Sequence, residues 1–290
     1  MLTKKKSTKI LVTGSEGFIA KDLISKLKKD NYIVYTLDLK KNKSKYHFSL
    51  DLLDYEKIIK TITIKFDTII HLASQSDIEK SLKDPSETIF NNIIGTLNIL
   101  KLREKKNIKN LIFASTIYVN SDQGSFYRVS KQTCEDLIIE FNKRNKFNFS
   151  IIRYGSVYGK FAPLSNRINK VIEGFRNNKK QMINGKGDEI RKYIHVSDVA
   201  SLTIKIMELK KTKFKFYEIT GKKPYKFSKL ISQLEDKTKI NPIHYNNIIS
   251  EGHYIKNPYN KTIYPIMKLS PKNDNTVNKI LELINNKWKL

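Results

Sequence analysis

The sequence has one cysteine and no long apolar run, and each of these shortages excludes a class of protein. The single cysteine, Cys134, excludes an internal disulfide framework and a cysteine-based zinc site, and we expect no metal. No apolar run approaches the roughly 18–20 residues that a membrane span needs. Few apolar residues follow the basic N-terminus, too few for the core of a signal peptide. We therefore expect a soluble, cytoplasmic protein without a membrane partner.

Acidic residues are also scarce, since 28 Asp and Glu stand against 55 Lys and Arg, for a formal net charge of +27. Such a charge suggests nucleic acid or an anionic membrane as a partner. However, the lysines are spread along the whole chain, no segment is rich in arginine, and no zinc-finger, RRM or KH pattern is present. We expect no dedicated nucleic-acid partner. A positive field would also favour a charged nucleotide ligand.

Apolar, β-branched runs alternate with amphipathic segments along the first part of the 290 residues. Continuous apolar strands that alternate with helices predict a doubly wound α/β fold, with a parallel sheet covered on both faces. The pattern loosens after about residue 160. We expect a first domain over residues 1–155, to which segments near 190–215 return, and a smaller mixed α/β C-terminal domain over 156–290 that binds substrate. The expected strands cover 9–14, 32–39, 66–73, 110–116, 149–155, 192–196 and 215–220, and the expected helices cover 18–30, 54–64, 85–106 and 125–145.

The first strand leads into the turn "TGSEGFIA", in which Gly14 and Gly17 lie three residues apart before a helix. The first glycine permits a tight turn, and the second lets the backbone approach a pyrophosphate at the positive end of the helix dipole. Asp38 ends the second strand, 21 residues after Gly17, where a carboxylate accepts hydrogen bonds from a ribose 2′-hydroxyl. This carboxylate would repel a 2′-phosphate, so it favours NAD over NADP, although Lys40 and Lys41 weaken that preference. The turn thus indicates a dinucleotide site on a Rossmann sheet.

Eight short motifs follow one another along the chain: "TGSEGFIA" (13–20), "LDLLD" (50–54), "HLAS" (71–74), "NIIGTLNIL" (92–100), "FAST" (113–116), "YRVSK" (127–131), "RYGSVYG" (153–159) and "GKGDEIRKYIHVSDVA" (185–200). Most of these motifs are weak singly, but their order along the chain is specific. Together they resemble the extended short-chain dehydrogenases/reductases, in particular the group of NAD-dependent nucleotide-sugar epimerases and dehydratases.

The resemblance implies a role for each residue that matches a family motif. The cofactor residues would be Gly14, Gly17, Phe18, Ile19, Asp38, Asp51, Leu52, Leu72, Ala73, Asn92 and Lys131. The catalytic residues would be Thr116, Tyr127 and Lys131, and the substrate diphosphate would lie near Ser156 and Arg191. Members of the family dimerise through a bundle that includes the Tyr–Lys helix, so we expect a homodimer. For Arg191, a surface salt bridge is the competing interpretation.

Tyr127 and Lys131 are four residues apart, which places both on one face of a helix. Tyrosine is a poor base at neutral pH because its ordinary pKa is about 10, and a nearby ammonium lowers that pKa. We expect Lys131 to do so and also to hold the nicotinamide ribose. Thr116 would orient the substrate hydroxyl while Tyr127 exchanges a proton with it and hydride moves to or from the nicotinamide.

Departures from the family pattern narrow the reaction. Ile117 and Tyr118 follow Thr116, where dehydratases carry an Asp–Glu pair and decarboxylases a Glu, which argues against both reactions. Only ten residues separate Thr116 from Tyr127, so the pocket has a shorter cover, and Ser156 replaces the usual Asn. The remaining reactions are NAD-dependent 4-epimerisation, which Asp38 favours, and one-way 4-keto reduction. A non-catalytic NAD-binding regulator is the alternative from another class.

Several other polar residues have a structural interpretation. We expect Cys134 to be a small packed side chain, since a lone cysteine in a helix is most often a core residue. His71 and His195 lie in apolar strand contexts, so we expect packing or hydrogen-bonding roles rather than proton transfer. Asp198, in "SDVA", stands where it would cap a helix.

Overall fold

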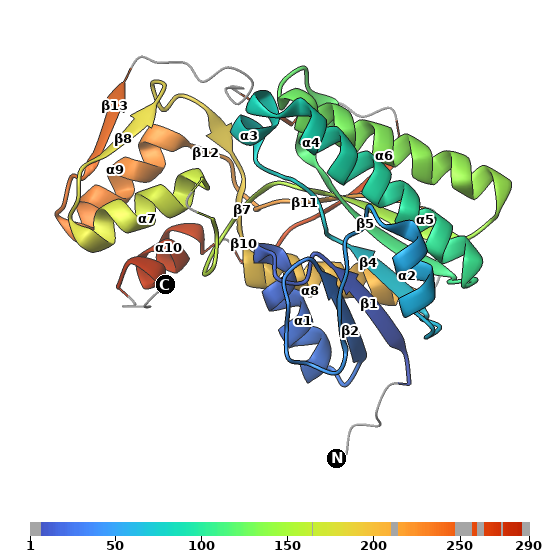
Figure 1. The fold of residues 1–290 in the computed structure, drawn as a ribbon. Helices are drawn as coiled ribbons and strands as arrows, with labels where there is room; N and C mark the ends of the chain where they lie inside the picture. The colour runs from blue at the N-terminus through green and yellow to red at the C-terminus, as the bar shows by residue number, and fades with distance from the viewer. Residues whose placement is uncertain are drawn as a thin grey trace.

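The computed structural model describes residues 7–163, 165–209, 214–246, 257–259, 264–273 and 275–285. Its centre is an eight-stranded sheet with the order β14-β11-β6-β5-β4-β1-β2-β3, in which every pairing is parallel (Figure 1). The expected doubly wound sheet is therefore confirmed. Its strands are β1 Lys9–Thr13, β2 Ile33–Asp38, β3 His47–Ser49, β4 Thr68–His71, β5 Asn110–Thr116, β6 Asn148–Tyr154, β11 Phe216–Ile219 and β14 Ile266–Leu269.

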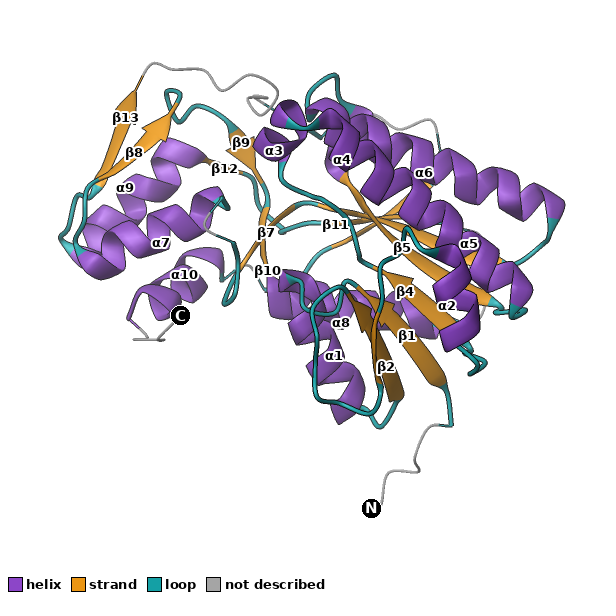
Figure 2. Cartoon of the chain, in the orientation of Figure 1, coloured by secondary structure: helices purple, strands orange, loops and turns teal. Residues whose placement is uncertain are grey.

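Helices cover both faces of this sheet, as Figure 2 shows. The helices of this part are α1 Phe18–Lys29, α2 Tyr55–Thr61, α3 Ile78–Lys83, α4 Pro85–Ile89, α5 Gly95–Lys105, α6 Ser125–Arg144 and α8 Val196–Glu208. In β1, Ile10 and Val12 pack with α1 and α8, whereas Leu11 packs with α5 and α6. Successive strand residues point to opposite faces, so a strand covered on both faces must be apolar throughout. This is why the strands at the centre of the sheet are rich in apolar residues.

The segment expected as one helix over 85–106 contains a π-helical piece, η1 Phe90–Ile94, between α4 and α5. Insertions of this type occur often at functional sites. The carboxyl ends of β1 and β4 are the point where the strand order reverses, because β2 lies on one side of β1 and β4 on the other. In doubly wound sheets ligands bind at such a point. The glycine turn follows β1, and the motif "HLAS" begins at the end of β4.

A second lobe packs beside the sheet with a core of its own, which contains Tyr158, Val171, Phe175, Leu230 and Ile280. It is built from α7 Arg167–Asn177, α9 Phe227–Thr238, α10 Thr276–Asn285 and the paired short strands β7 Ser156–Tyr158, β8 Gln181–Asn184, β9 Ile190–Arg191, β10 Tyr193–His195, β12 Tyr225–Lys226 and β13 Ile243–Asn246. This lobe lies beyond the carboxyl ends of the strands (Figure 1). Because α8 packs against α1, we propose that residues 196–208 belong to the first domain, within the returning segment expected near 190–215. None of the helices in the described parts of the chain has the length and apolar character to cross a bilayer.

Candidate active site

The glycine turn after β1 is held close to the loop after β4. Gly14 has a φ of +67°, and a Cβ atom there would lie 2.6 Å from the Cα atom of Ala73. This turn therefore requires glycine for its conformation and for the space available. Gly17 is the N-cap of α1, and no side chain caps the helix. The first N–H groups of α1, at Phe18 and Ile19, thus lack a capping side chain, which is the arrangement that a pyrophosphate needs.

The Asp38 carboxylate lies beside this turn. One of its oxygens accepts a hydrogen bond from the backbone N–H of Glu16 at 2.9 Å, and the other accepts one from Lys40 N–H at 3.0 Å. Asp51 and Leu52 continue the same rim: the Asp51 carboxylate is exposed and accepts from Leu53 N–H, and the Leu52 side chain is buried. Each carboxylate oxygen of Asp38 keeps a lone pair for a further donor. The donor and acceptor set suits the phosphate and ribose groups of a dinucleotide.

His71 ends β4 beneath the turn and has a structural role. Its two ring nitrogens lie 2.7 Å from the Thr13 hydroxyl and 3.1 Å from the Thr96 hydroxyl. Burial lowers the pKa of His71 to about 3, and the Lys131 charge adds to this effect. The ring is therefore neutral at physiological pH. The expected packing and hydrogen-bonding role is confirmed.

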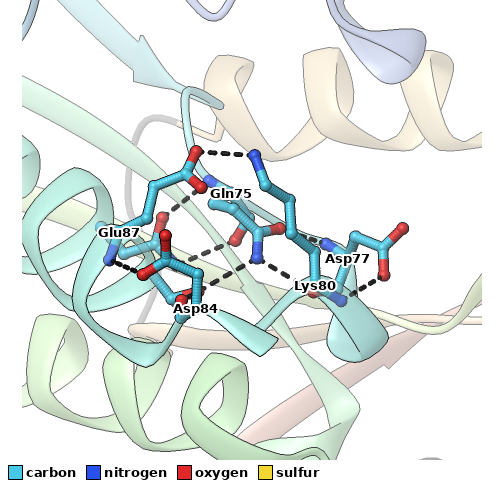
Figure 3. A network of polar contacts seen from close by, with 7 residues as sticks. Gln75, Asp77, Lys80, Asp84 and Glu87 are labelled. Carbon is cyan, nitrogen blue, oxygen red and sulfur yellow. Dashed lines mark hydrogen bonds and ion pairs between the residues drawn. The ribbon is translucent and has the colours of Figure 1, made fainter. Parts of the chain in front are cut away.

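The loop after β4 is fixed by a network around Gln75 (Figure 3). Asn92, in η1, accepts from Gln75 N–H at 2.7 Å and donates to the Gln75 carbonyl at 2.9 Å. The Gln75 side chain in turn bonds to the backbone of Asp77, and Lys80 forms an ion pair with Glu87 at 2.6 Å. Asn92 is buried and is not among the described residues that line the cleft. Its role in the structure is therefore to position the loop through its hydrogen bonds with Gln75. A direct bond from Asn92 to the cofactor stays a prediction.

Thr116, Tyr127 and Lys131 come together where β5 ends and α6 begins. Burial raises the pKa of Tyr127, and the neighbouring Thr116 side chain offsets part of this effect. Lys131 is buried and donates from Nζ to the Ala114 carbonyl at 2.9 Å, and its ammonium lies 5.9 Å from the centre of the Tyr127 ring. Burial lowers the pKa of Lys131 to about 8.

The expectation that Lys131 lowers the pKa of Tyr127 is not met in this structure. Desolvation dominates at the phenol, and the Lys131 charge is not among the causes of its shift. The Lys131 ammonium donates a hydrogen bond to the Ala114 carbonyl of β5. Two residues with positive φ, Gly124 at 104° and Ser125 at 52°, precede the turn of helix that carries Tyr127. A left-handed serine is strained, which is common beside active sites.

All of these elements border one cleft of about 1090 Å³, above the usual 300–1,000 Å³ of a small-molecule site. The expected site residues that line it are Gly14, Gly17, Phe18, Ile19, Asp38, Asp51, Leu52, Leu72, Ala73, Thr116, Tyr127, Lys131, Ser156 and Arg191. Arg191 is buried and donates a hydrogen bond to the Ile190 carbonyl. Its burial argues against the competing interpretation of Arg191 as part of a surface salt bridge.

Sequence reasoning missed Gln75, Arg167 and Glu189, which also line the cleft. Asn166 caps the helix that Arg167 begins, and an Asn before an amphipathic segment is a readable start signal. That signal does not tell which way the helix faces. Gln75 follows the motif "HLAS" directly, yet its importance lies in contacts with Thr88 and Asn92.

Two other expectations concern residues away from the reacting groups. Cys134 is fully buried and its thiol contacts the Asn92 carbonyl, so its packing role is confirmed. Asp198 does not cap α8: the N-cap is His195, whose ring accepts from Ser197 N–H. The N-cap therefore lies three residues earlier than expected, and Asp198 instead pairs with Lys279 at 2.6 Å.

Comparisons with known proteins agree with this geometry. The NAD-dependent epimerase/dehydratase family matches residues 10–219. A putative UDP-glucose 4-epimerase of Methanocaldococcus jannaschii is 28% identical over 225 residues, which cover 69% of this chain and 74% of that protein. A UDP-glucuronate 4-epimerase of Thermodesulfobacterium geofontis is 27% identical over 258 residues, 78% of this chain and 79% of that protein. The fold is similar to that of the Thermotoga maritima UDP-glucose 4-epimerase solved with UDP-glucose (TM-score 0.81, 21% identity, 95% of this chain and 98% of the other).

Proposed function

Because the chain belongs to the NAD-dependent epimerase/dehydratase family, we propose that it is a nucleotide-sugar 4-epimerase that uses Thr116, Tyr127 and Lys131. The observation that carries this proposal is that Thr116, Tyr127 and Lys131 line the same cleft as the glycine turn and Asp38. These residues supply a proton-transfer pair and a dinucleotide cradle. The relatives with epimerase names support the same assignment.

The residues divide the chemistry between them. NAD, held by the glycine turn and Asp38, would supply a reversible hydride acceptor, with hydride leaving one face of the sugar carbon and returning to the other. Thr116 orients the sugar C4 hydroxyl, and Tyr127 takes the hydroxyl proton as the carbon becomes a ketone and gives it back as the alcohol re-forms. Net change is inversion at one carbon, with no net oxidation. The raised pKa of Tyr127 favours the neutral phenol, which is the form that donates the proton in the second half-reaction.

A 4-ketoreductase would use the same residues, so only the cofactor separates the two functions. The Asp38 carboxylate, bonded to the glycine turn through Glu16 N–H, would repel the 2′-phosphate of NADPH. This favours NAD and therefore the epimerase. Dehydration across C5 and C6 lacks support, because Ile117 and Tyr118 supply no carboxylate after Thr116.

The proposal is tested by removing any bound nucleotide, restoring NAD and assaying a panel of nucleotide sugars. Epimerase activity gives product without a net change in absorbance at the NADH band, whereas consumption of NAD(P)H with a 4-keto sugar indicates the reductase. Tyr127→Phe should lower the rate by about 10²–10⁴-fold. Tyr46→Phe, an exposed tyrosine outside the cleft, is the matched control. Full activity in the Tyr127→Phe variant would exclude both enzymes, and binding of NAD without turnover of any sugar would favour the regulator.

We infer that the protein is a homodimer that pairs through α6. Phe126 and Val129, three residues apart on that helix, and Phe90 on η1 are exposed large apolar side chains. An apolar stripe of this kind on a helix surface marks an interface. Sedimentation equilibrium of a Val129→Asp variant tests this, since the substitution should shift the protein to monomer.

A cytoplasmic location and the lack of a dedicated nucleic-acid partner remain part of this proposal. The lone cysteine supports the location, and the dispersed lysines support the lack of a nucleic-acid partner.

A further inference from the structure

The wall of the cleft that the second lobe contributes is cationic. Of the seven arginines in the sequence, Arg167 and Arg191 line the cleft, and Lys170 lies one turn after Arg167 on α7. Among the described residues of this lobe that line the cleft, Glu189 supplies the carboxylate. Three cations against one carboxylate give this wall a net positive charge, which suits an anionic group of the substrate.

Arg167 is held in place from three sides. Its Nη2 atom lies 2.8 Å from the Glu189 carboxylate and donates to the Asn184 carbonyl at 3.1 Å. The guanidinium carbon lies 4.2 Å from the centre of the Phe227 ring, close enough for a cation–π contact. The Glu189 side chain is only 2% exposed, so little of this carboxylate reaches the cleft surface. These contacts hold the planar group of Arg167 in one orientation before any ligand arrives.

The guanidinium still has donors to offer. The hydrogen bond and ion pair that it makes with described residues both use Nη2, and 24% of the side chain is exposed in the cleft wall. A guanidinium presents five N–H donors in a fork that matches phosphate oxygens. Arg191, by contrast, is buried. Arg167 is therefore the better exposed of the two arginines.

The position of Arg167 adds a second attraction for an anion. It is the first residue of α7, an 11-residue helix that begins at the cleft, and Asn166 and Ile168 line the cleft beside it. The N-terminus of a helix carries a partial positive charge. The Asn166 side chain already caps two of its N–H groups, so the side chain of Arg167 must make the direct bonds.

We propose that Arg167, positioned by Glu189, binds the diphosphate of the nucleoside-diphosphate substrate together with Arg191. This inference rests on the proposed function for the identity of the substrate class. The direct contact is assigned to Arg167, and Glu189 acts through it as a positioning residue.

The test measures binding without turnover. Isothermal titration of the full chain with UDP, dTDP, GDP and CDP identifies the nucleoside diphosphate that binds most tightly. The nucleoside monophosphate and the nucleoside with the same base are then titrated in the same way. Arg167→Gln should weaken binding of that diphosphate by at least tenfold and binding of the nucleoside by less than twofold. Lys179→Gln, which removes one charge from an exposed position just after α7 and outside the cleft, is the matched control and should change neither.

The single substitution leaves the Glu189 carboxylate buried without its cation, which threatens folding. The double variant Arg167→Met/Glu189→Gln removes both charges and keeps the side-chain volume. It replaces the single variant in the titration if the single variant does not fold, and it should weaken diphosphate binding by the same factor. An equal loss for nucleoside and diphosphate would assign Arg167 to the base and overturn the proposal, as would unchanged affinity or the lack of binding by all four diphosphates. Loss of diphosphate affinity in a protein without epimerase activity would leave this proposal standing while the proposed reaction fails.

Discussion

The Nη2 atom of Arg153 lies 2.6 Å from Oε2 of Glu135, and both side chains are about 95% buried. The Nε atom of Arg153 also donates to Oε1 of Glu135 at 3.0 Å, so the pair is bidentate, and the Ser115 hydroxyl donates to the same oxygen. Arg153 lies on β6, Glu135 on α6 one turn after Lys131, and Ser115 on β5 directly before Thr116. This one ion pair therefore ties together the elements that carry the proposed catalytic residues.

Arg153→Met should destabilise the protein strongly, because it leaves the Glu135 carboxylate buried and unpaired. A broken buried pair costs about 3–5 kcal/mol in the free energy of unfolding. Arg144→Met provides the comparison, since Arg144 pairs with Glu104 on the surface and exposed pairs contribute about 0–1 kcal/mol. Urea unfolding of both variants measures the difference. Equal losses would contradict the structural role given to the Arg153–Glu135 pair.

Gly14→Ala should reduce stability and dinucleotide binding together. A Cβ atom at this position would lie 2.6 Å from the backbone of Ala73, and the φ of +67° alone costs an L-residue about 1–2 kcal/mol. Gly95→Ala is the matched control, because the nearest atom to its added Cβ lies 3.5 Å away and the residue is helical. That variant should be neutral or more stable by about 0.5–1 kcal/mol. Thermal unfolding and titration with NAD provide the two readouts.

Acid should destabilise the protein partly through His71, whose pKa is lowered to about 3 in the folded state from an ordinary value of 6.5. Between these values the unfolded chain binds a proton that the folded protein refuses, so stability falls as pH falls below about 6.5. From pH 7 to pH 5 this amounts to about 2 kcal/mol. In His71→Gln the contribution disappears, so the gap in unfolding free energy between wild type and variant should narrow by that amount. A gap that stays constant with pH would show that His71 titrates normally.

NAD affinity should weaken as pH rises through the pKa of Lys131, which is about 8. Above this value the ammonium loses its proton, and with it the charge that we expect to hold the dinucleotide. If binding requires the ammonium, the dissociation constant should rise about tenfold between pH 7 and pH 9. Calorimetric titration of the cofactor-free protein tests this. Lys131→Met should bind weakly at every pH with a flat profile, and a steep profile in that variant would assign the effect to another group.

Much of the fold followed from local sequence. The strands at the sheet's centre are rich in apolar residues, which predicts burial on both faces, and the turn at Gly14 and Gly17 marked the first crossover. Helix details were less predictable: the π segment around Asn92 and the His195 cap of α8 depend on hydrogen bonds that residue spacing does not reveal. Ligands of doubly wound sheets bind at the carboxyl ends of the strands, so a sequence that predicts the sheet also indicates where the site lies.

The sequence by itself determined the doubly wound sheet, the dinucleotide turn and the four-residue spacing of Tyr127 and Lys131, because all three are written in short stretches of chain. Only the tertiary structure decided where side chains point. Lys131 turns to the Ala114 carbonyl, Asn92 holds Gln75, and Arg167 meets Glu189. Each of these contacts joins residues that are brought together only when separate elements pack, and the burial that results sets the charge and reach of every group in the cleft.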